Sequence, residues 1–499
     1  MRSSEERNGD EWRNSTSSRA TGRSRAGMMS RNFFLHIHAP RVHPNSMKPG
    51  YTLGLGVILG FLFLVMVLTG LILMVYYTPS VESAYHSVKD IVYLVPGGRI
   101  IRNMHWWASQ GMVIVVFLHL LRVFYTGSYL GGRSLNWVLG VVLLILTLLS
   151  NFSGYLLPWD QLAYWAVTIG SNIAASAREL TDLLGITQGF DPGGFLKKLL
   201  IGGESVGQAA LSRFFALHVI FLPLSILVIM GIHFWRIRKD GGLSRPPVAG
   251  EPGIEMPANM KSDARIPVAK KPGAGERGTE KPVAGEPVKK WYAWPVLMWT
   301  ELAILIGVVA VVLLTALIAD APLLEQADPS HPENPAKSPW YFLGIQELVS
   351  YSAFAGGLLV PVLYLVFLFS IPYRDREDRY IGVWFSGPSG ITTLWKSAVF
   401  ALALVLSQLF ILIRFGWLRD WIPGISQWFV MLINPATITA LAFILSAEWV
   451  RRRSGSSRKA AVWLFTSSFV ALVLFTVVGI WFRGPNWEFY WSAGQWPAQ

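Results

Sequence analysis

The sequence predicts an all-α protein that crosses a membrane many times. Of its 499 residues, 52% are hydrophobic, and the mean hydropathy is +0.42. Nine apolar runs are long enough, or nearly so, to cross the hydrocarbon core of a bilayer as helices. They lie near residues 51–77, 105–126, 135–157, 213–235, 294–319, 349–371, 395–414, 428–447 and 461–482. Basic residues gather in alternate loops between the runs, as the orientation of a multi-pass protein requires.

The basic loops predict how the chain is oriented. Residues 1–50 hold nine lysines and arginines and residues 236–290 hold twelve, whereas residues 320–348 hold only Lys337. The positive-inside rule therefore places the N-terminus and the 236–290 segment in the cytoplasm. Nine spans then leave the C-terminus outside, and we expect a multi-pass protein of the inner (cytoplasmic) membrane of a bacterium. The net charge of +13 belongs to these loops and does not indicate nucleic-acid binding.

Two polar segments predict the domain organisation. Residues 1–32 are rich in arginine and serine and are expected to form a disordered basic tail. Residues 239–290 are rich in proline, glycine, alanine and charge, and they repeat themselves loosely, so we expect a flexible cytoplasmic linker. Between these segments, residues 33–238 carry four of the apolar runs, and residues 291–499 carry the other five.

Four histidines lie inside apolar runs of the first unit, where an unpaired polar group is costly. His105 and His119 are 14 positions apart, and His218 and His233 are 15 apart. With a rise of 1.5 Å per residue, each pair is separated by about 21–22 Å along its helix and stays broadly on one face. Two such helices side by side, within a four-helix bundle, offer two stacked bis-imidazole sites, as two haem irons need. Pro223 is expected to kink its helix, which could absorb the extra residue.

Other roles for these histidines are weaker. A lone histidine in a membrane can simply bond a neighbouring helix, but two matched pairs favour ligands. Zinc is disfavoured because each pair is too widely spaced to share an ion, and the chain has no cysteine. The lack of cysteine also excludes a covalently attached haem of the CxxCH type, a cysteine-ligated iron–sulfur cluster and any disulfide in this chain.

Glycines repeat the spacing of the first histidine pair. Gly56 and Gly70 are 14 positions apart in the first run, and so are Gly140 and Gly154 in the third. A flat macrocycle between helices needs missing side chains at its own depth, which glycine supplies. The alternative is ordinary packing of small residues between membrane helices. The match with the histidine spacing favours haem contact.

Arginines stand at the expected ends of the histidine helix. Arg102 precedes His105 by three residues, and Arg122 follows His119 by three. Arginine pairs well with carboxylates, so both are candidates to bind haem propionates. An arginine that extends to the membrane surface from the end of a span is the alternative.

At this point the sequence resembles the cytochrome b family, the dihaem subunit of bc-type quinol–cytochrome c reductases and of photosynthetic bf-type complexes. The resemblance covers roughly residues 33–240, and the first half is most similar to the photosynthetic type, which also has the spacing of 15. The second half resembles subunit IV of those complexes more weakly. Besides the histidines and glycines, the resemblance rests on SGYLLPWDQLAYWAV at 153–167 and ESVGQAALSRFFALHVIFLPL at 204–224.

The resemblance implies a cofactor arrangement. His105 and His218 would hold an outer, low-potential haem b, and His119 and His233 an inner, high-potential haem b, both without covalent attachment. This order agrees with the orientation expected from the basic loops.

The resemblance also implies two quinone sites. The family has a Pro-Glu-Trp-Tyr motif at its outer site, where this chain reads Ser-Pro-Trp-Tyr at 338–341, so the carboxylate is missing. Glu347 is the nearest acid and could replace it, or could be a glutamate at a helix start. The residues expected at the outer quinol site are Trp159, Asp160, Trp340, Tyr341 and Glu347. Those expected at the inner quinone site are Arg238, Lys239 and Asp240.

The expected function is proton-motive quinol oxidation at the outer face, with electrons crossing the membrane through two haems. The implied partners on other chains are a Rieske-type iron–sulfur protein and a c-type cytochrome, and a homodimer in the lipid bilayer is expected. Two alternatives stay open. One is a dihaem, quinone-linked anchor of another reductase, and the other is a transporter that relays protons through its histidines. A visible spectrum separates the transporter from both haem proteins.

Overall fold

The computed structural model describes residues 41–42, 46, 49–240, 242–245 and 291–497. The expected tail at 1–32 and the expected linker beyond residue 245 lie outside the described residues. The described chain is almost wholly helical, which confirms the predicted all-α membrane class. Its two strands have two residues each: β1 (Arg41–Val42) pairs antiparallel with β2 (Trp291–Tyr292).

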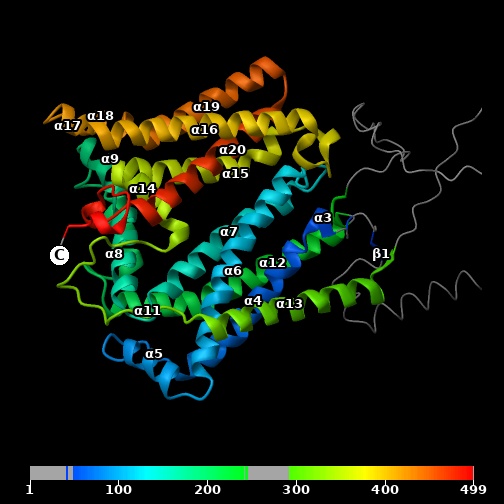
Figure 1. Ribbon diagram of the computed structural model, residues 1–499, viewed down its shortest axis with the longest axis horizontal. Coiled ribbons are helices and arrows are strands. Elements are labelled where there is room, and N and C mark those ends of the chain that lie inside the picture. Colours follow the sequence, from blue (N-terminus) through cyan, green and yellow to red (C-terminus); the bar gives the residue numbers. More distant parts are fainter. Residues whose placement is uncertain (1–40, 43–45, 47–48, 241, 246–290, 498–499) are drawn as a thin grey trace, which may run out of the picture.

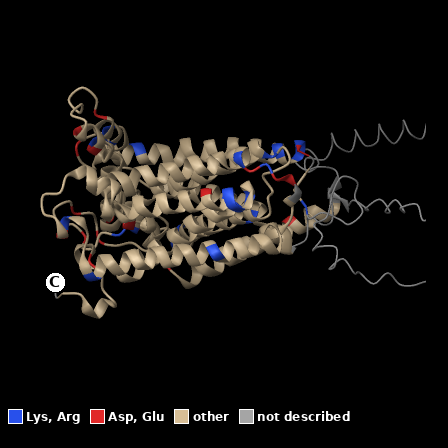
Figure 2. Cartoon of the chain, turned by 90° about the horizontal axis from the view of Figure 1, so that it is seen from above, with Lys and Arg blue, Asp and Glu red and all other residues tan. Residues whose placement is uncertain are grey.

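Eight helices of the described residues are long and apolar enough to cross a membrane. They cover Leu55–Tyr76, Gly98–Tyr125, Ser134–Tyr155, Gln208–Lys239, Pro295–Ile318, Ala355–Arg374, Pro388–Trp421 and Ser457–Phe482. Each corresponds to one of the nine predicted runs. Most charged residues lie toward the two ends of the molecule, and few lie between them (Figure 2), as expected for a multi-pass membrane protein.

The remaining predicted run, the eighth along the chain near 428–447, is divided in the structure. α18 (Gln427–Leu432) ends before Asn434, whose side chain caps α19 (Pro435–Ser454) by accepting a hydrogen bond from Thr437 N at 3.0 Å. The last turns of α19 carry Glu448 and three arginines, too much charge for a span by composition. Yet α16 (Pro388–Phe415) and α20 (Ser457–Val477) both run toward the end of the molecule where the C-terminus lies (Figure 1). α19, which comes between them in the sequence, runs in the opposite direction.

The first half forms a four-helix bundle. Its long helices are α4 (Leu55–Tyr76), α6 (Gly98–Tyr125), α7 (Ser134–Tyr155) and a segment made of α11 (Gln208–Ala216), the π-turn η2 (Leu217–Phe221) and α12 (Leu222–Lys239). α4 packs on α6, and α7 packs on α12 (Figure 1). Shorter helices lie outside this bundle: α3 (Pro49–Thr52), α5 (Ala84–Tyr93), α8 (Gln161–Ala175), α9 (Ala177–Leu183) and α10 (Pro192–Ile201).

The π-turn explains the longer step of the second histidine pair. A π-turn inserts one extra residue into an α-helix. η2 contains His218, so the step of 15 from His218 to His233 has nearly the rotation of a step of 14 in regular helix. The sequence predicts that a kink at Pro223 absorbs the extra residue. In the structure η2, which ends two residues before this proline, absorbs it instead.

The second half covers the bundle on two sides. α13 (Met298–Ile318) packs on α4 and α6, and α15 (Val360–Arg374), which follows the π-turn η5 (Ala355–Leu359), packs on α7. α14 (Trp340–Tyr351) packs on α20. The remaining short elements are η4 (Ala293–Leu297), η6 (Asp378–Tyr380), η7 (Trp384–Ser386), α17 (Leu418–Trp421), η8 (Val478–Phe482), η9 (Pro485–Trp487) and η10 (Ala493–Gln495).

The two halves share a buried core. A hydrophobic cluster joins Phe124 and Trp137 of the first half to Leu368 and Phe465 of the second. Beside it, the buried Arg458 guanidinium lies 3.3 Å from Asp375 and donates to the backbone oxygen of Phe124 at 2.8 Å. The halves therefore pack as parts of one structure, and α3 and the C-terminus lie at opposite ends of its long axis (Figure 1).

Candidate functional site

The four histidines stand on two helical segments of the first bundle. α6 carries His105 and His119, η2 carries His218, and α12 carries His233. His105 and His218 line a cavity of about 280 Å³, called the first cavity. His119 and His233 line a cavity of about 910 Å³, called the second cavity. The structure therefore pairs the histidines as the sequence predicts.

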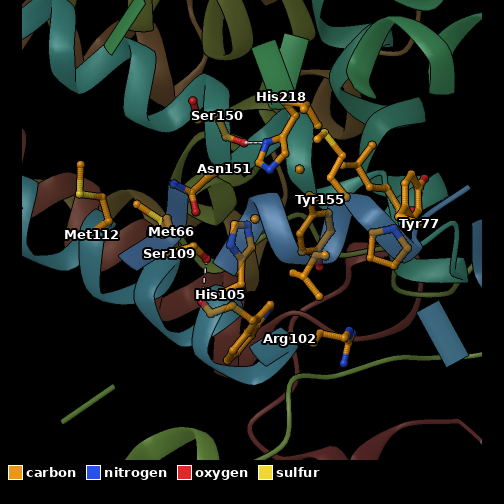
Figure 3. A pocket seen from close by; sticks show the side chains of 18 of the residues that line it. Met66, Tyr77, Arg102, His105, Ser109, Met112, Ser150, Asn151, Tyr155 and His218 are labelled. Atoms are coloured by element: carbon orange, nitrogen blue, oxygen red, sulfur yellow. Dashed lines mark hydrogen bonds between the residues drawn. The ribbon is translucent and has the colours of Figure 1, made fainter. Parts of the chain in front are cut away.

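In the first cavity the two imidazoles face each other from neighbouring helices (Figure 3). The ring centres of His105 and His218 are 6.1 Å apart. His218 Nδ1 donates to the backbone oxygen of Ser150 at 2.9 Å. His105 Nδ1 lies 3.0 Å from Thr69 Oγ1, whose own hydroxyl donates to Val65 O at 2.7 Å, so the imidazole is the donor. Both Nδ1 atoms are thus occupied, which leaves Nε2 of each ring for a metal, as in most histidine–metal sites.

Glycines bring the neighbouring helices close to these imidazoles. A Cβ on Gly154 would collide with the His218 ring, 2.8 Å from its Nδ1 atom. A Cβ on Gly70 would lie 3.1 Å from His105 Cε1. Both distances are shorter than ordinary van der Waals contact, so α4 and α7 can approach the ligand helices only without side chains at these positions.

The second cavity repeats this arrangement with more space. A Cβ on Gly56 would lie 3.5 Å from His119 Cε1, and one on Gly140 would lie 3.7 Å from His233 Cε1. His119 Nδ1 is buried and has no hydrogen-bond partner among the described residues. All four predicted glycines therefore adjoin a histidine, each glycine next to a different one.

The two predicted arginines differ in their surroundings. Arg102 lines the first cavity, but its guanidinium donates to the backbone oxygens of Ala321 and Pro322, at 2.9 and 2.7 Å. Arg122 lines the second cavity and donates through Nε to Tyr51 O at 3.1 Å. The Nη2 atom of Arg122 is buried without a partner in the described chain. Arg122 is the better placed of the two to bind a carboxylate in the cavity.

These features fit a haem in each cavity. Two imidazoles bound on opposite sides of one iron, each through a bond of about 2 Å, have ring centres roughly 6 Å apart, close to the spacing of His105 and His218. In the second cavity, the buried Nη2 of Arg122 lacks a partner among the described residues, as expected where a carboxylate such as a haem propionate binds. Among the described residues, no cluster of three or more potential metal ligands competes with this interpretation.

Comparison with known proteins identifies the family. Residues 41–241 match the family model described as Cytochrome b/b6/petB. The cytochrome b6 of Heliomicrobium gestii is 43% identical over 197 residues, which cover 39% of this chain and 87% of that protein. The chain belongs to the cytochrome b family. The cytochrome b6 of Synechococcus elongatus is 44% identical over 179 residues, which cover 36% of this chain and 78% of that protein. The resemblance read from the histidines and glycines is confirmed, and this family implies non-covalently bound haem b.

The second half also shares a known fold. A chain described as Hyperthermophilic respiratory Complex III superposes with a TM-score of 0.57 at 21% sequence identity. The match covers 88% of this chain and 92% of that chain, so it extends well beyond the dihaem bundle. This chain therefore has the arrangement of helices seen in that structure over most of its length.

The residues predicted for the outer quinol site divide into two groups. Asp160 and Tyr341 line the first cavity together with the histidines. Trp340 donates from its indole to Gln110 Oε1 at 2.7 Å, and Gln110 itself lines the cavity. Trp159 is buried in a neighbouring core cluster. The structure therefore brings Asp160 and Tyr341 to the cavity, with Trp340 one contact away from it.

Glu347 lies elsewhere. Its carboxylate is fully buried and does not line the first cavity. It pairs with Arg483 at 2.5 Å and accepts hydrogen bonds from Tyr351 at 2.6 Å and Trp487 at 3.0 Å. A carboxylate held by these partners is poorly suited to accept a proton from a quinol, so the geometry argues against the expected role.

The residues predicted for the inner site are only partly together. Arg238 and Asp240 line the second cavity. Asp240 pairs with Arg236 at 2.9 Å through Oδ1, and its Oδ2 atom is buried without a partner among the described residues. Lys239 does not line the cavity; its ammonium lies over the ring of Trp235 at 4.9 Å.

Several residues of the site were not predicted. Thr69 holds the His105 imidazole through its hydroxyl, and Ser150 holds the His218 imidazole through its backbone oxygen. They lie one and four positions before the predicted glycines Gly70 and Gly154. Arg133 and Glu301 line the second cavity. Glu301, an acid inside an apolar run, was a signal that sequence reasoning could have used.

Proposed function

We propose that this chain is the dihaem cytochrome b subunit of a proton-motive quinol–cytochrome c oxidoreductase. The observation that supports this proposal most strongly is that two histidine pairs line two separate cavities of one bundle. When bound, two non-covalent b haems would supply one-electron transfer across the membrane. His105 and His218 would hold the outer, low-potential haem, and His119 and His233 the inner, high-potential haem. In this proposal, residues 33–238 are the dihaem domain and residues 291–499 supply the outer quinol-site helix and the extra spans.

The basic loops support the direction of this arrangement. In the proposed orientation the end of the molecule that carries α3 faces the cytoplasm, and the C-terminus lies outside, in the inner membrane of a bacterium. The first cavity then opens near the outer face and would take quinol. The second lies near the cytoplasmic face and would take quinone.

Asp160 is the proposed proton acceptor for quinol oxidation. Its Oδ1 accepts from Ala163 N at 2.9 Å and its Oδ2 from Leu324 N at 3.1 Å, so the carboxylate is held at the cavity wall. Burial raises the pKa of the Asp160 carboxyl, against the opposing effect of these N–H groups. A carboxylate with a raised pKa accepts a proton more readily. Burial also raises the pKa of the Tyr341 hydroxyl, which therefore stays protonated and acts only as a hydrogen-bond donor or as an apolar wall.

Basic residues and one carboxylate would serve the inner site. Arg122 Nη2 and Arg133 Nε are buried without partners in the described chain and suit haem propionates. Arg238 would orient a quinone oxygen, and Asp240 Oδ2 would relay protons from the cytoplasm to the quinone, whose reduction to quinol consumes two. Lys239 would add positive charge at the cavity mouth.

The partners are proposed on other chains. The matched structure is described as a respiratory Complex III, which supports assembly into a complex. Because this chain has no cysteine, an iron–sulfur cluster of Rieske type and a c-type haem must be supplied by other subunits. A homodimer in the lipid bilayer is part of the same proposal.

A dihaem anchor that links another reductase to quinone is the second candidate. The observation that favours it is the missing motif carboxylate combined with the engagement of Glu347 by Arg483. Family membership and the glycines next to the histidines favour both haem functions over a proton-relay transporter.

The proposed function is tested with the purified complex. A pyridine haemochrome assay with a protein determination should give two haems b per chain. Quinol should reduce both haems b and, through the iron–sulfur and c-type subunits of the complex, cytochrome c. One haem per chain would overturn the four-ligand assignment. Two haems without any reduction of cytochrome c would favour the anchor.

A further inference from the structure

The C-terminal tail, defined here as residues 478–491, packs directly on the helix of the proposed outer quinol site. A Cβ on Gly479 of η8 would lie 3.1 Å from Leu343 Cβ on α14. A Cβ on Gly344 of α14 would lie 2.7 Å from Thr476 Oγ1, just before the tail. Glycine at such contacts lets the two helices approach each other closely. The orientation of α14 is therefore set by α20 and the tail.

A buried ion pair joins the tail to the C-terminal part of α14. Arg483 donates to Glu347 Oε2 through Nε at 2.9 Å and to Oε1 through Nη2 at 2.5 Å. Trp487 donates from its indole to Oε2 at 3.0 Å, and Tyr351 donates to Oε1 at 2.6 Å. Both residues of the pair are buried. A two-bond arginine–carboxylate pair specifies geometry, and loss of one partner leaves an uncompensated buried charge.

The tail also holds the loop that precedes α14. The Asn334 amide donates to Asn486 Oδ1 at 3.1 Å, and Asn486 N donates to Asn334 Oδ1 at 2.6 Å. The Lys337 ammonium donates to Ile480 O at 2.9 Å. Asn486 and Trp487 both have left-handed backbone angles, with φ of 56° and 60°. Two successive strained residues persist only where the surrounding contacts determine them.

The contacts of the tail with Lys337 and with Glu347 lie on either side of the quinol-site residues in the sequence. Trp340 and Tyr341 lie between Lys337 and Glu347, and Tyr341 lines the first cavity. We propose that the C-terminal tail is the positioning element of the outer quinol site, with Arg483 and Glu347 as its positioning residues. The proposal rests on the proposed function for the identity of the substrate. It assigns a role to the RGPNWEFYW ending and to Glu347.

The haem ligands lie on helices other than those that the tail contacts. They stand on α6, η2 and α12, whereas the tail contacts α14, α20 and the loop before α14, and its Val478 and Phe482 pack in a core cluster with residues of α16 and α19. A variant of Arg483 should therefore disturb the quinol site and leave both haems in place, which separates positioning from general unfolding.

The test uses the purified holoprotein with Arg483→Gln, Arg483→Lys and the control Glu488→Gln. Glu488 is exposed in the same tail and does not contact α14 in the described interactions. Hydrogen–deuterium exchange of the 334–351 peptide should become at least about 100-fold faster in Arg483→Gln, because a broken buried ion pair lowers local stability strongly. Arg483→Lys should be intermediate, since lysine keeps the charge and loses the two-bond geometry. The control should match the unmodified protein.

Quinol kinetics give the functional part of the test. We expect KM for quinol to rise about tenfold or more in Arg483→Gln, with a smaller change in the maximal rate, while haem content and the reduced spectrum stay the same. Unchanged exchange in the 334–351 peptide would overturn the positioning role, whatever the kinetics. Faster exchange with unchanged KM would overturn the link to the quinol site. If Arg483→Gln loses haem, exchange of the 334–351 peptide and KM for quinol are instead compared between Arg483→Lys and the unmodified protein.

A failure of the proposed function has a different signature. The unmodified protein would then show no quinol oxidation at all, whereas the exchange measurement on the same samples would still report whether the tail holds α14.

Discussion

The glycine beside His218 provides a sharp test of the haem site. In Gly154→Ala, the new methyl group would lie 2.8 Å from His218 Nδ1, whereas carbon contacts are comfortable at about 3.5–4.0 Å. The ring cannot retreat freely, because its Nδ1 is bonded to Ser150 O at 2.9 Å. Overpacking of this kind costs about 1–3 kcal/mol, and replacing glycine by alanine inside a helix returns only about 0.5–1 kcal/mol. We expect the first cavity to bind haem about 10-fold more weakly, since about 1.4 kcal/mol is a factor of ten.

Gly140→Ala is the matched control. Its methyl group would lie 3.7 Å from His233 Cε1, which is ordinary contact, so the second cavity should keep its affinity. The assay is haem retention during dilution, followed by the pyridine haemochrome ratio and by redox titration of the two b-type signals. Gly154→Ala should lose the low-potential signal first, and Gly140→Ala should resemble the unmodified protein. Equal loss in both variants, or loss of the high-potential signal in Gly154→Ala, would refute the reasoning.

Three further predictions use other parts of the chain. His119→Ala should lower the ratio from two haems to one and spare the low-potential signal; loss of both signals would show that the sites depend on each other. Asp160→Asn keeps a good helix cap but cannot accept a proton, so quinol-driven reduction should slow about 100-fold or more. In the unmodified protein this rate should fall as the pH drops through the raised pKa of Asp160, because the carboxylate becomes protonated, and a pH-independent rate would contradict its role. Because the chain has no cysteine, an impermeant maleimide should label Ala493→Cys but not Ser454→Cys in intact cells, and the opposite pattern would reverse the proposed orientation.

The haem-binding half was predictable because its chemistry is local and periodic. Histidines inside apolar runs are costly, and their spacing translates directly into positions along a helix. The structure pairs His105 with His218, and His119 with His233, as that spacing predicts. The glycines were also predictable, although their contact is more specific than expected: each lies against an imidazole. Thr69 was missed because a hydroxyl in an apolar helix usually bonds its own backbone. Ser150 was missed because it holds His218 through its backbone oxygen, a group that every residue has.

The run near 428–447 shows that composition alone is insufficient to predict where a helix begins and ends. The run near 428–447 is apolar enough to suggest one continuous helix, but Asn434 and Pro435 end α18 and begin α19. Asparagine caps a helix and proline favours its first turn, so the break was visible in the sequence. The hydropathy of the run alone does not reveal these two residues, because they change its mean little.

The position of Glu347 depended on information that the sequence near it does not contain. Six residues after Tyr341, and close to a motif that lacks its carboxylate, Glu347 is the natural substitute when only neighbouring residues are considered. Its partners Arg483 and Trp487 lie 136 and 140 positions further along the chain. Had no cation been present, a fully buried carboxylate would be costly and a functional role would be the better explanation. The arginine removes that cost, so burial of Glu347 indicates a structural ion pair, and the search for the proton acceptor moves to Asp160 at the cavity wall.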